Sequence, residues 1–227
     1  MRENMHPGPG RAWAVSYGPP TGDPMPRPAT VLPPLVPRRG NRFTRWLGRA
    51  MLRLMGWEFV GEFPDYPKMV LIVAPHSSNR DFFVGVGVMF ALGFEARFIG
   101  KRELFRGPAG IVMRWLGGIP VDRRRPEGFV EQLVESLGRY ERVILAITPE
   151  GTRKPVTEWK TGFYRIAHAA GLPIAPVYFD NVPRRVGFFP VLTPTGDADR
   201  DIAALRARYA GLLRRDQLPG RGRSAAP

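Results

Sequence analysis

Cysteine is absent from this chain of 227 residues, which excludes disulfide bonds and cysteine-ligated metal centres. The three histidines are His6, His76 and His168, and they lie too far apart to match the spacing of a metal-ligand set. No apolar run reaches the roughly 20 residues of a membrane-spanning helix, and the N-terminus lacks the compact apolar segment of a signal peptide. We therefore expect no metal site, no spanning helix and no export.

Acidic residues are few relative to basic ones. Lysine and arginine number 34 against 20 aspartates and glutamates, which gives a formal net charge of +14. Such a charge favours anionic partners, among them nucleic acid, anionic lipid surfaces, phosphorylated substrates and acidic carrier proteins. The charge alone does not select one of them, since it also serves solubility. Nucleic acid is not an expected partner, because no recognition-helix or aromatic-and-basic strand pattern accompanies the charge.

Composition divides the chain into four parts. Prolines and glycines recur through residues 1–40, which predicts a disordered tail. Residues 41–57 predict a basic amphipathic helix, and residues 58–215 predict a single folded domain of ordinary size. Residues 216–227 predict a second, arginine-rich disordered tail.

The segment 41–57 places apolar residues three and four positions apart and arginines on much of the other side. An arginine-faced helix of this kind suits the surface of an anionic bilayer. It suits equally well a helix that packs its apolar stripe on the domain, because the hydrophobic pattern is the same in both cases. Both interpretations rest on the same apolar residues, which are Phe43, Trp46, Leu47, Ala50, Met51, Leu54 and Met55.

Apolar runs typical of buried strands alternate with helical patterns through the rest of the chain. The expected helices begin near Asp81, at residue 108, at Pro126, at residue 160 and near Ala198. This alternation predicts an α/β fold, a single domain with a mixed, largely parallel sheet flanked by helices. The expected strands lie at residues 70–73, 96–100, 118–121, 143–147 and 174–179, and residues 186–192 are a candidate hairpin partner.

The first of these strands leads directly into a polar turn that carries His76 and Asp81. An imidazole can take a proton near neutral pH, and an aspartate on one ring nitrogen would leave the other nitrogen free to act as a base. No G-x-S-x-G sequence and no cysteine offers a nucleophile, so a covalent enzyme intermediate is not favoured. The pair therefore predicts base-assisted attack by a substrate hydroxyl, although the pair taken alone favours a structural histidine in a turn, because chance often produces this spacing.

Two more polar turns follow predicted strands. Glu150, Gly151, Thr152 and Arg153 come directly after the strand at 143–147, and Lys101 follows the strand at 96–100. Arginine binds phosphate in a bidentate manner, and glycine lets the backbone approach a ligand closely. Because the carboxyl ends of parallel strands meet at one edge of a sheet, these cations are expected near His76.

Four blocks of sequence, in this order, resemble those of the glycerolipid acyltransferases, most closely the family of 1-acylglycerol-3-phosphate acyltransferases. They are H-S-S-N-R-D at 76–81, G-K-R-E-L-F at 100–105, P-E-G-T-R at 149–153 and L-P-I-A-P-V at 172–177. The resemblance covers roughly residues 45–195. It implies transfer of a fatty acyl group from acyl-CoA or acyl-carrier protein to a lysophospholipid hydroxyl in phospholipid biosynthesis, with 1-acylglycerol-3-phosphate as the expected acceptor and no cofactor beyond the co-substrate.

The resemblance also implies a role for each matching residue. His76 would be the general base and Asp81 its orienting partner. The fourth block, with Pro173 and Pro176, would serve acyl-donor binding and the shape of the site. The acceptor phosphate would be held by Lys101 and Arg153, in a pocket shaped by Glu150, Gly151 and Thr152.

Several departures from the family pattern keep alternatives open. Pro75 stands where many lysophosphatidate-acylating members carry asparagine, and the pairing Asn79-Arg80 is not their commonest one. A different lysolipid acceptor is therefore the first alternative, and a non-catalytic basic binder of nucleic acid or anionic lipid is the second. The strongly hydrophobic N-terminal anchor common in the family is missing, so we expect a peripheral protein at the cytoplasmic face of the membrane, held there by residues 41–57.

Overall fold

The computed structural model describes residues 32–76, 78–121, 128–152, 156–182 and 184–216. Within these ranges the strands form one sheet in the order β1-β7-β6-β2-β5-β3-β4. The five strands from β6 to β4 are parallel, β7 is antiparallel to β6, and β1 is parallel to β7. The strands are β1 (Glu58–Phe59), β2 (Lys68–Ala74), β3 (Arg97–Lys101), β4 (Gly118–Val121), β5 (Val143–Ile147), β6 (Ile174–Asp180) and β7 (Arg185–Phe188).

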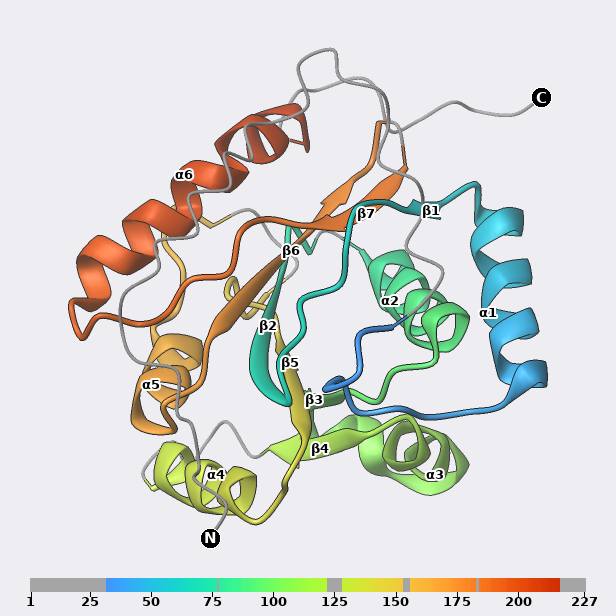
Figure 1. Ribbon diagram of the computed structural model, residues 1–227, viewed down its shortest axis with the longest axis horizontal. Coiled ribbons are helices and arrows are strands. Elements are labelled where there is room, and N and C mark those ends of the chain that lie inside the picture. Colours follow the sequence, from blue (N-terminus) through green and yellow to red (C-terminus); the bar gives the residue numbers. More distant parts are fainter. Residues whose placement is uncertain (1–31, 77, 122–127, 153–155, 183, 217–227) are drawn as a thin grey trace, which may run out of the picture.

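Helices cover both faces of this sheet (Figure 1). On one side α2 and α3 lie nearest the sheet and α1 packs on the outside of α2, whereas α4, α5 and α6 cover the other side. This arrangement confirms the predicted α/β domain with a mixed, largely parallel sheet. The helices are α1 (Arg42–Met55), α2 (Asn79–Leu92), α3 (Gly107–Trp115), α4 (Phe129–Gly138), α5 (Gly162–Ala169) and α6 (Ala198–Asp216), and a 3-10 turn, η1 (Arg102–Phe105), precedes α3.

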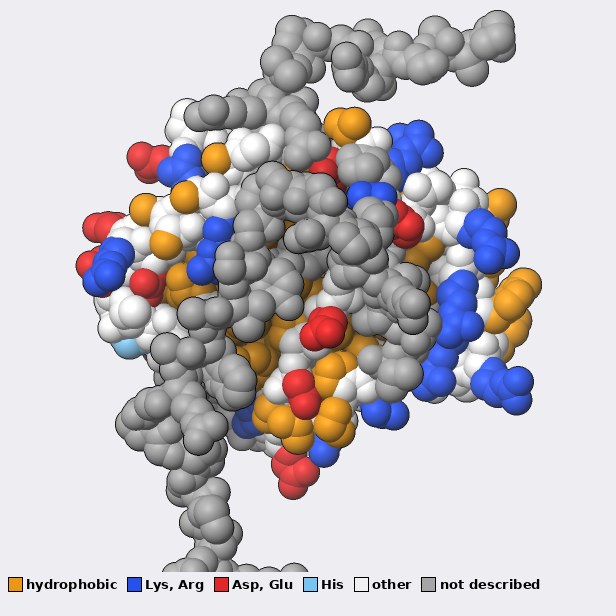
Figure 2. Space-filling view, turned by 45° about the horizontal axis from the view of Figure 1, so that its top comes forward, with side chains coloured by type: hydrophobic (Ala, Val, Ile, Leu, Met, Phe, Trp, Pro, Cys, Tyr) orange, Lys and Arg blue, Asp and Glu red, His pale blue; other side chains and the backbone are white. Residues whose placement is uncertain are grey.

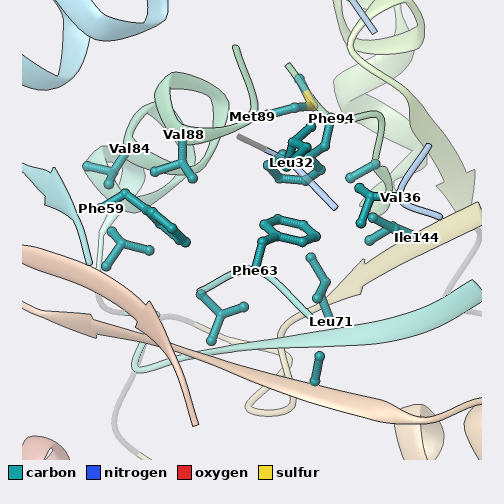
Figure 3. Close-up of a cluster of buried hydrophobic side chains, with 14 of the residues drawn as sticks. Leu32, Val36, Phe59, Phe63, Leu71, Val84, Val88, Met89, Phe94 and Ile144 are labelled. Atoms are coloured by element: carbon teal, nitrogen blue, oxygen red, sulfur yellow. The ribbon is translucent and has the colours of Figure 1, made fainter. Parts of the chain in front are cut away.

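The segment from residue 32 to residue 40 belongs to the folded domain, so the expected disordered tail over 1–40 extends too far. Leu32 and Val36 are buried, and they pack in the apolar cluster that contains Phe63 and Phe94 (Figure 3). The backbone N–H of Arg39 donates to the carbonyl of Gly93. Prolines in this segment prevent regular structure but do not prevent its apolar side chains from being buried.

The packing of α1 separates the two interpretations that its sequence leaves open. The side of α1 that faces α2 carries the buried residues Gly48 and Leu52. A Cβ at residue 48 would lie 2.3 Å from the backbone nitrogen of Ala91, so the two helices approach each other closely there. By contrast, Phe43, Trp46 and Leu54 are 64%, 62% and 88% exposed. The predicted apolar stripe is therefore divided, because Met55 packs against the core whereas these three large side chains face outward.

The helix α2 was expected to be buried nearly all round, and it is buried on two sides because it lies between the sheet and α1. Val84 and Val88 are buried, but Phe83 remains 53% exposed near the start of the helix. The expectation is thus wrong at Phe83, since α1 covers α2 on one side only.

The last helix, α6, buries the four residues that its periodicity predicts, Ile202, Leu205, Tyr209 and Leu212. Its first turn also holds a buried carboxylate, that of Asp201. This group accepts hydrogen bonds from the Tyr164 hydroxyl (2.7 Å), the Thr195 backbone N–H (2.7 Å) and the Thr195 hydroxyl (3.0 Å). Burial acts to raise the pKa of Asp201, but these hydrogen bonds outweigh it and hold the pKa below its usual value.

Replacing Asp201 by alanine is expected to lower the free energy of unfolding by about 2–4 kcal/mol, because the Tyr164 hydroxyl and the Thr195 N–H lose their acceptor. A carboxyl with a depressed folded-state pKa stabilises the fold above its unfolded-state pKa, and this contribution is lost as pH falls through the folded-state value. Urea unfolding at neutral and acidic pH measures both effects. The exposed Asp199→Ala is the control, and equal losses in the two variants would contradict the prediction.

Candidate active site

The turn between β2 and α2 brings the first catalytic candidates together. Ser78 is the N-cap of α2, and its hydroxyl oxygen accepts a hydrogen bond from the backbone N–H of Arg80 (3.2 Å). The backbone N–H of Ser78 donates in turn to Asp81 Oδ2 (2.7 Å). This reciprocal capping starts the helix at Asn79, and it places the Asp81 carboxylate at the positive end of the helix.

The same carboxylate faces the imidazole of His76. His76 Nδ1 lies 3.4 Å from Asp81 Oδ2, the oxygen that also receives the Ser78 N–H. The Asp81 side chain is only 3% exposed, whereas that of His76 is 17% exposed. The pair therefore has a buried, fixed acid and an imidazole with access to solvent. Since Nδ1 faces the aspartate, Nε2 is the ring nitrogen that is free to meet a substrate.

The Glu150 carboxylate joins the turn after β5 to the turn after β2. Glu150 is 7% exposed, and its Oε2 accepts a hydrogen bond from the backbone N–H of His76 (3.0 Å). The two residues are 74 positions apart in sequence, and they meet because β2 and β5 are neighbouring parallel strands. Burial raises the pKa of the Tyr209 hydroxyl well above its usual value, and the charge of Glu150 adds to this rise. Through its hydrogen bond with the His76 N–H, Glu150 holds the backbone that carries His76.

This contact distinguishes two roles for Glu150. If it positions His76, then Glu150→Ala should lower kcat about a hundredfold through misplacement of the imidazole, with the KM for the phosphate-bearing acceptor nearly unchanged. Glu150→Gln keeps an oxygen that can accept from the His76 N–H, so it should recover most of the activity. Steady-state kinetics on both variants, beside the exposed control Glu141→Ala, measure this split. A rise in KM with unchanged kcat would instead assign Glu150 to the phosphate pocket.

The backbone of Gly151 turns through a positive φ of 63°, which favours glycine. The side chain of Lys160 lies across this glycine, because a Cβ at residue 151 would be 2.9 Å from Lys160 Cδ and 3.3 Å from its Nζ. Lys160 is not among the site residues predicted from the sequence. The signal that it offered was weak, a lone lysine between Trp159 and the start of α5, and the backbone bond from its N–H to the Pro149 carbonyl (2.9 Å) is what brings it to the turn.

The other predicted site residues fall in three places. Lys101 ends β3 and is exposed at the carboxyl edge of the sheet, which β2 and β5 share. Thr152 follows Gly151 in the turn after β5 and is partly exposed, and Arg153 lies outside the described residues. His76, Asp81 and Glu150 are thus joined by direct contacts, and Lys101 and Thr152 share their edge of the sheet.

Neither predicted proline lies at the carboxyl edge of the sheet, since Pro173 directly precedes β6 and Pro176 lies within it. The carbonyl of Pro173 accepts a hydrogen bond from the Val70 N–H (2.9 Å), near the amino-terminal end of β2. Pro176 is buried in β6, in register with Ile72 of β2. Any influence of these prolines on acyl-donor binding has to pass through the position of β2, and that role stays a prediction.

The fold and the site together define a class: an α/β protein that presents an Asp-supported histidine at the carboxyl edge of a largely parallel sheet. A search against family models matches residues 61–180 to the Acyltransferase family. The match covers more than half of the chain, and the chain belongs to this family.

Curated relatives and a solved structure agree with this assignment. The chain is 25% identical over 152 residues to the 1-acyl-sn-glycerol-3-phosphate acyltransferase of Haemophilus influenzae, covering 63% of this chain and 61% of that protein. It is 26% identical over 122 residues to the enzyme of that name from Salmonella typhimurium, covering 51% and 49%. The chain thus spans about half to three fifths of these relatives. The crystal structure of the 1-acyl-sn-glycerophosphate (LPA) acyltransferase PlsC from Thermotoga maritima shares the fold, with a TM-score of 0.55, 19% identity and 76% of each chain covered.

Proposed function

We propose that this protein is an O-acyltransferase that moves a fatty acyl group from acyl-CoA or acyl-carrier protein to the free hydroxyl of 1-acylglycerol-3-phosphate, in phospholipid biosynthesis. One observation carries the proposal, the contact of 3.4 Å between His76 Nδ1 and the buried carboxylate of Asp81. It supplies a base in the orientation that attack by a bound hydroxyl needs. Membership of the Acyltransferase family supports the reaction, and the names of the relatives support the acceptor.

The transfer would proceed in two steps. His76 Nε2 removes the proton from the acceptor hydroxyl as its oxygen attacks the thioester carbonyl carbon, which gives a tetrahedral intermediate and an imidazolium. The carboxylate of Asp81 offsets the positive charge of that imidazolium. The intermediate then collapses, the carbon–sulfur bond breaks, and the thiolate leaves with the proton from His76. The products are an ester and a free thiol.

The acceptor phosphate would bind at the same sheet edge. Lys101 at the end of β3 and Lys160 over Gly151 offer two cations, and Arg153 is the third predicted one. Gly151, with its positive φ and no Cβ, leaves room for the Lys160 side chain to lie over this turn. A dianionic phosphate would thus meet several positive charges beside the base that activates its neighbouring hydroxyl.

The protein would work at the surface of an anionic membrane. Within the part of the chain that the structure describes, no helix is both long and apolar enough to cross a bilayer. The helix α1 instead exposes Phe43, Trp46 and Leu54 beside exposed arginines and contains no acidic residue (Figure 2). An exposed apolar stripe with a basic border is the pattern of a helix that lies in the interface of an anionic membrane.

Release of free thiol from acyl-CoA tests the proposal directly, and the chain itself adds no background because it has no cysteine. Thiol release should require 1-acylglycerol-3-phosphate. Other lysolipids belong in the same panel, since Pro75 departs from the pattern of many lysophosphatidate-acylating relatives. Release with another lysolipid alone would move the proposal to that acceptor. Binding to nucleic acid that falls steeply with salt, without any acyl transfer, would favour a basic binder instead.

A further inference from the structure

A second exposed apolar stripe lies on α3. Ile111, Val112 and Trp115 are 71%, 50% and 53% exposed, and Pro108 is exposed as well. These four residues follow the spacing i, i+3, i+4, i+7, so they share one face of the helix. The opposite side of α3 packs inward through Gly110, where a Cβ would lie 2.1 Å from the carbonyl oxygen of Phe105. The apolar stripe of α3 therefore points away from the domain, as the stripe of α1 does.

The residues just before α1 contact the end of α3. Arg39, just before α1, places its guanidinium 4.8 Å from the centre of the Trp115 ring and donates a hydrogen bond to the Trp115 carbonyl. The ring of Phe90, in the second half of α2, lies 5.8 Å from that of Trp115. The start of α1 and the end of α3 are thus joined across the second half of α2, and the two helices flank it.

Charge indicates what covers these stripes. The sequence of α1 holds four arginines and no acidic residue. Around α3, Arg106 and Arg114 are exposed, with Glu103 as the acidic residue in the adjoining η1 turn. A surface of exposed aliphatic and indole side chains bordered by guanidinium groups matches the interface of a bilayer that contains anionic lipid.

We propose that α3 is a second bilayer contact, so that the protein rests on an anionic membrane through α1 and α3 together. The inference rests on the proposed function, because an acceptor lipid must reach the site from a membrane. One helix alone leaves the domain free to rotate about that helix axis, whereas two contacts on either side of α2 hold its tilt. α2 carries Asp81 in its first turn, so this tilt sets how the His76 edge faces the membrane.

The absence of cysteine allows a direct test. The variant Ile111→Cys is labelled with an environment-sensitive nitrobenzoxadiazole group. The label should brighten and shift its emission to the blue when vesicles of phosphatidylcholine and phosphatidylglycerol are added to the full chain. A label at Leu54 of α1 should respond in the same way. A label at Glu135 of α4, whose side chain is 69% exposed on the other face of the sheet, should not respond.

An Ile111 label that stays unchanged while the Leu54 label responds would overturn the proposal and leave α1 as the contact. An Ile111 signal that is already blue-shifted without vesicles and rises with protein concentration would also overturn it, in favour of a second copy of the chain. Both outcomes are independent of acyl transfer, so they are distinct from failure of the proposed function, which would show as no thiol release with a freely dissolved short-chain acceptor.

The paired change Ile111→Ser and Val112→Ser should lower the affinity for the same vesicles about tenfold, because two largely exposed aliphatic side chains are removed from the contact. Co-sedimentation with the vesicles measures this affinity. The matched pair Ile111→Leu and Val112→Ile retains the apolar surface and should bind as wild type. Urea unfolding should show little change for either pair, because surface substitutions away from special features have small effects. Equal vesicle binding by the two pairs would contradict the proposal.

Discussion

Replacing His76 by alanine is expected to lower kcat for acyl transfer between a hundredfold and ten-thousandfold, the range typical for loss of a general base. The acceptor KM should change far less, because the cations proposed to hold the phosphate lie on other strands and turns. The rate that remains would come from the positioning of donor and acceptor, which the variant keeps. Free thiol release, followed at saturating acceptor, measures the change.

The control is His168→Ala, since His168 is an exposed histidine on α5, which covers the other face of the sheet. It should retain the activity of the wild type, which separates loss of the base from loss of any imidazole. If His76→Ala kept a kcat within a few-fold of wild type while its fold was intact, His76 would not be the base. The role would then pass to another group at this edge.

The central strands were predictable because β2, β5 and β6 are largely apolar runs bounded by residues that break regular structure. Val143–Ile147 has the boundaries in the structure that its sequence indicates, and β2 extends the predicted run 70–73 to Lys68–Ala74. A parallel sheet buries both faces of its central strands, so such strands read as continuous apolar segments. The location of the candidate site followed from the same reasoning, since polar turns at the carboxyl ends of parallel strands lie at one edge.

What could not be predicted depends on contacts between distant residues. The sequence around Glu150 indicates a turn but not that its carboxylate reaches the backbone N–H of His76. Lys160 carries only a weak local signal, and its place over Gly151 follows from the contact of its backbone with Pro149. The pattern of α1 could not show which of its sides meets α2, because the small residue Gly48 makes the close approach beside Leu52 while Phe43, Trp46 and Leu54 remain outside. Hydrophobic periodicity is the same in both arrangements.

The second large effect is expected for Asp81→Asn, about a thousandfold in kcat. Asparagine keeps an oxygen that can accept the Ser78 N–H, so the start of α2 should survive. The amide is neutral, so it cannot offset the charge of the imidazolium that forms on His76 during the reaction. The loss should therefore appear in kcat, with the helical circular dichroism signal and the free energy of unfolding close to those of wild type.

Asp197→Asn is the matched control. The Asp197 carboxylate accepts a hydrogen bond from the backbone N–H of Arg200 (3.0 Å) at the start of α6, away from His76. Aspartate and asparagine cap helices about equally well, so this variant should keep wild-type activity. Asp81→Asn with a kcat near that of wild type would mean that the aspartate serves the helix alone. A loss shared with Asp197→Asn would point to helix capping as the cause. A loss confined to Asp81→Asn requires the carboxylate charge beside His76, which is the feature that distinguishes a catalytic pair from a capped turn that happens to contain a histidine.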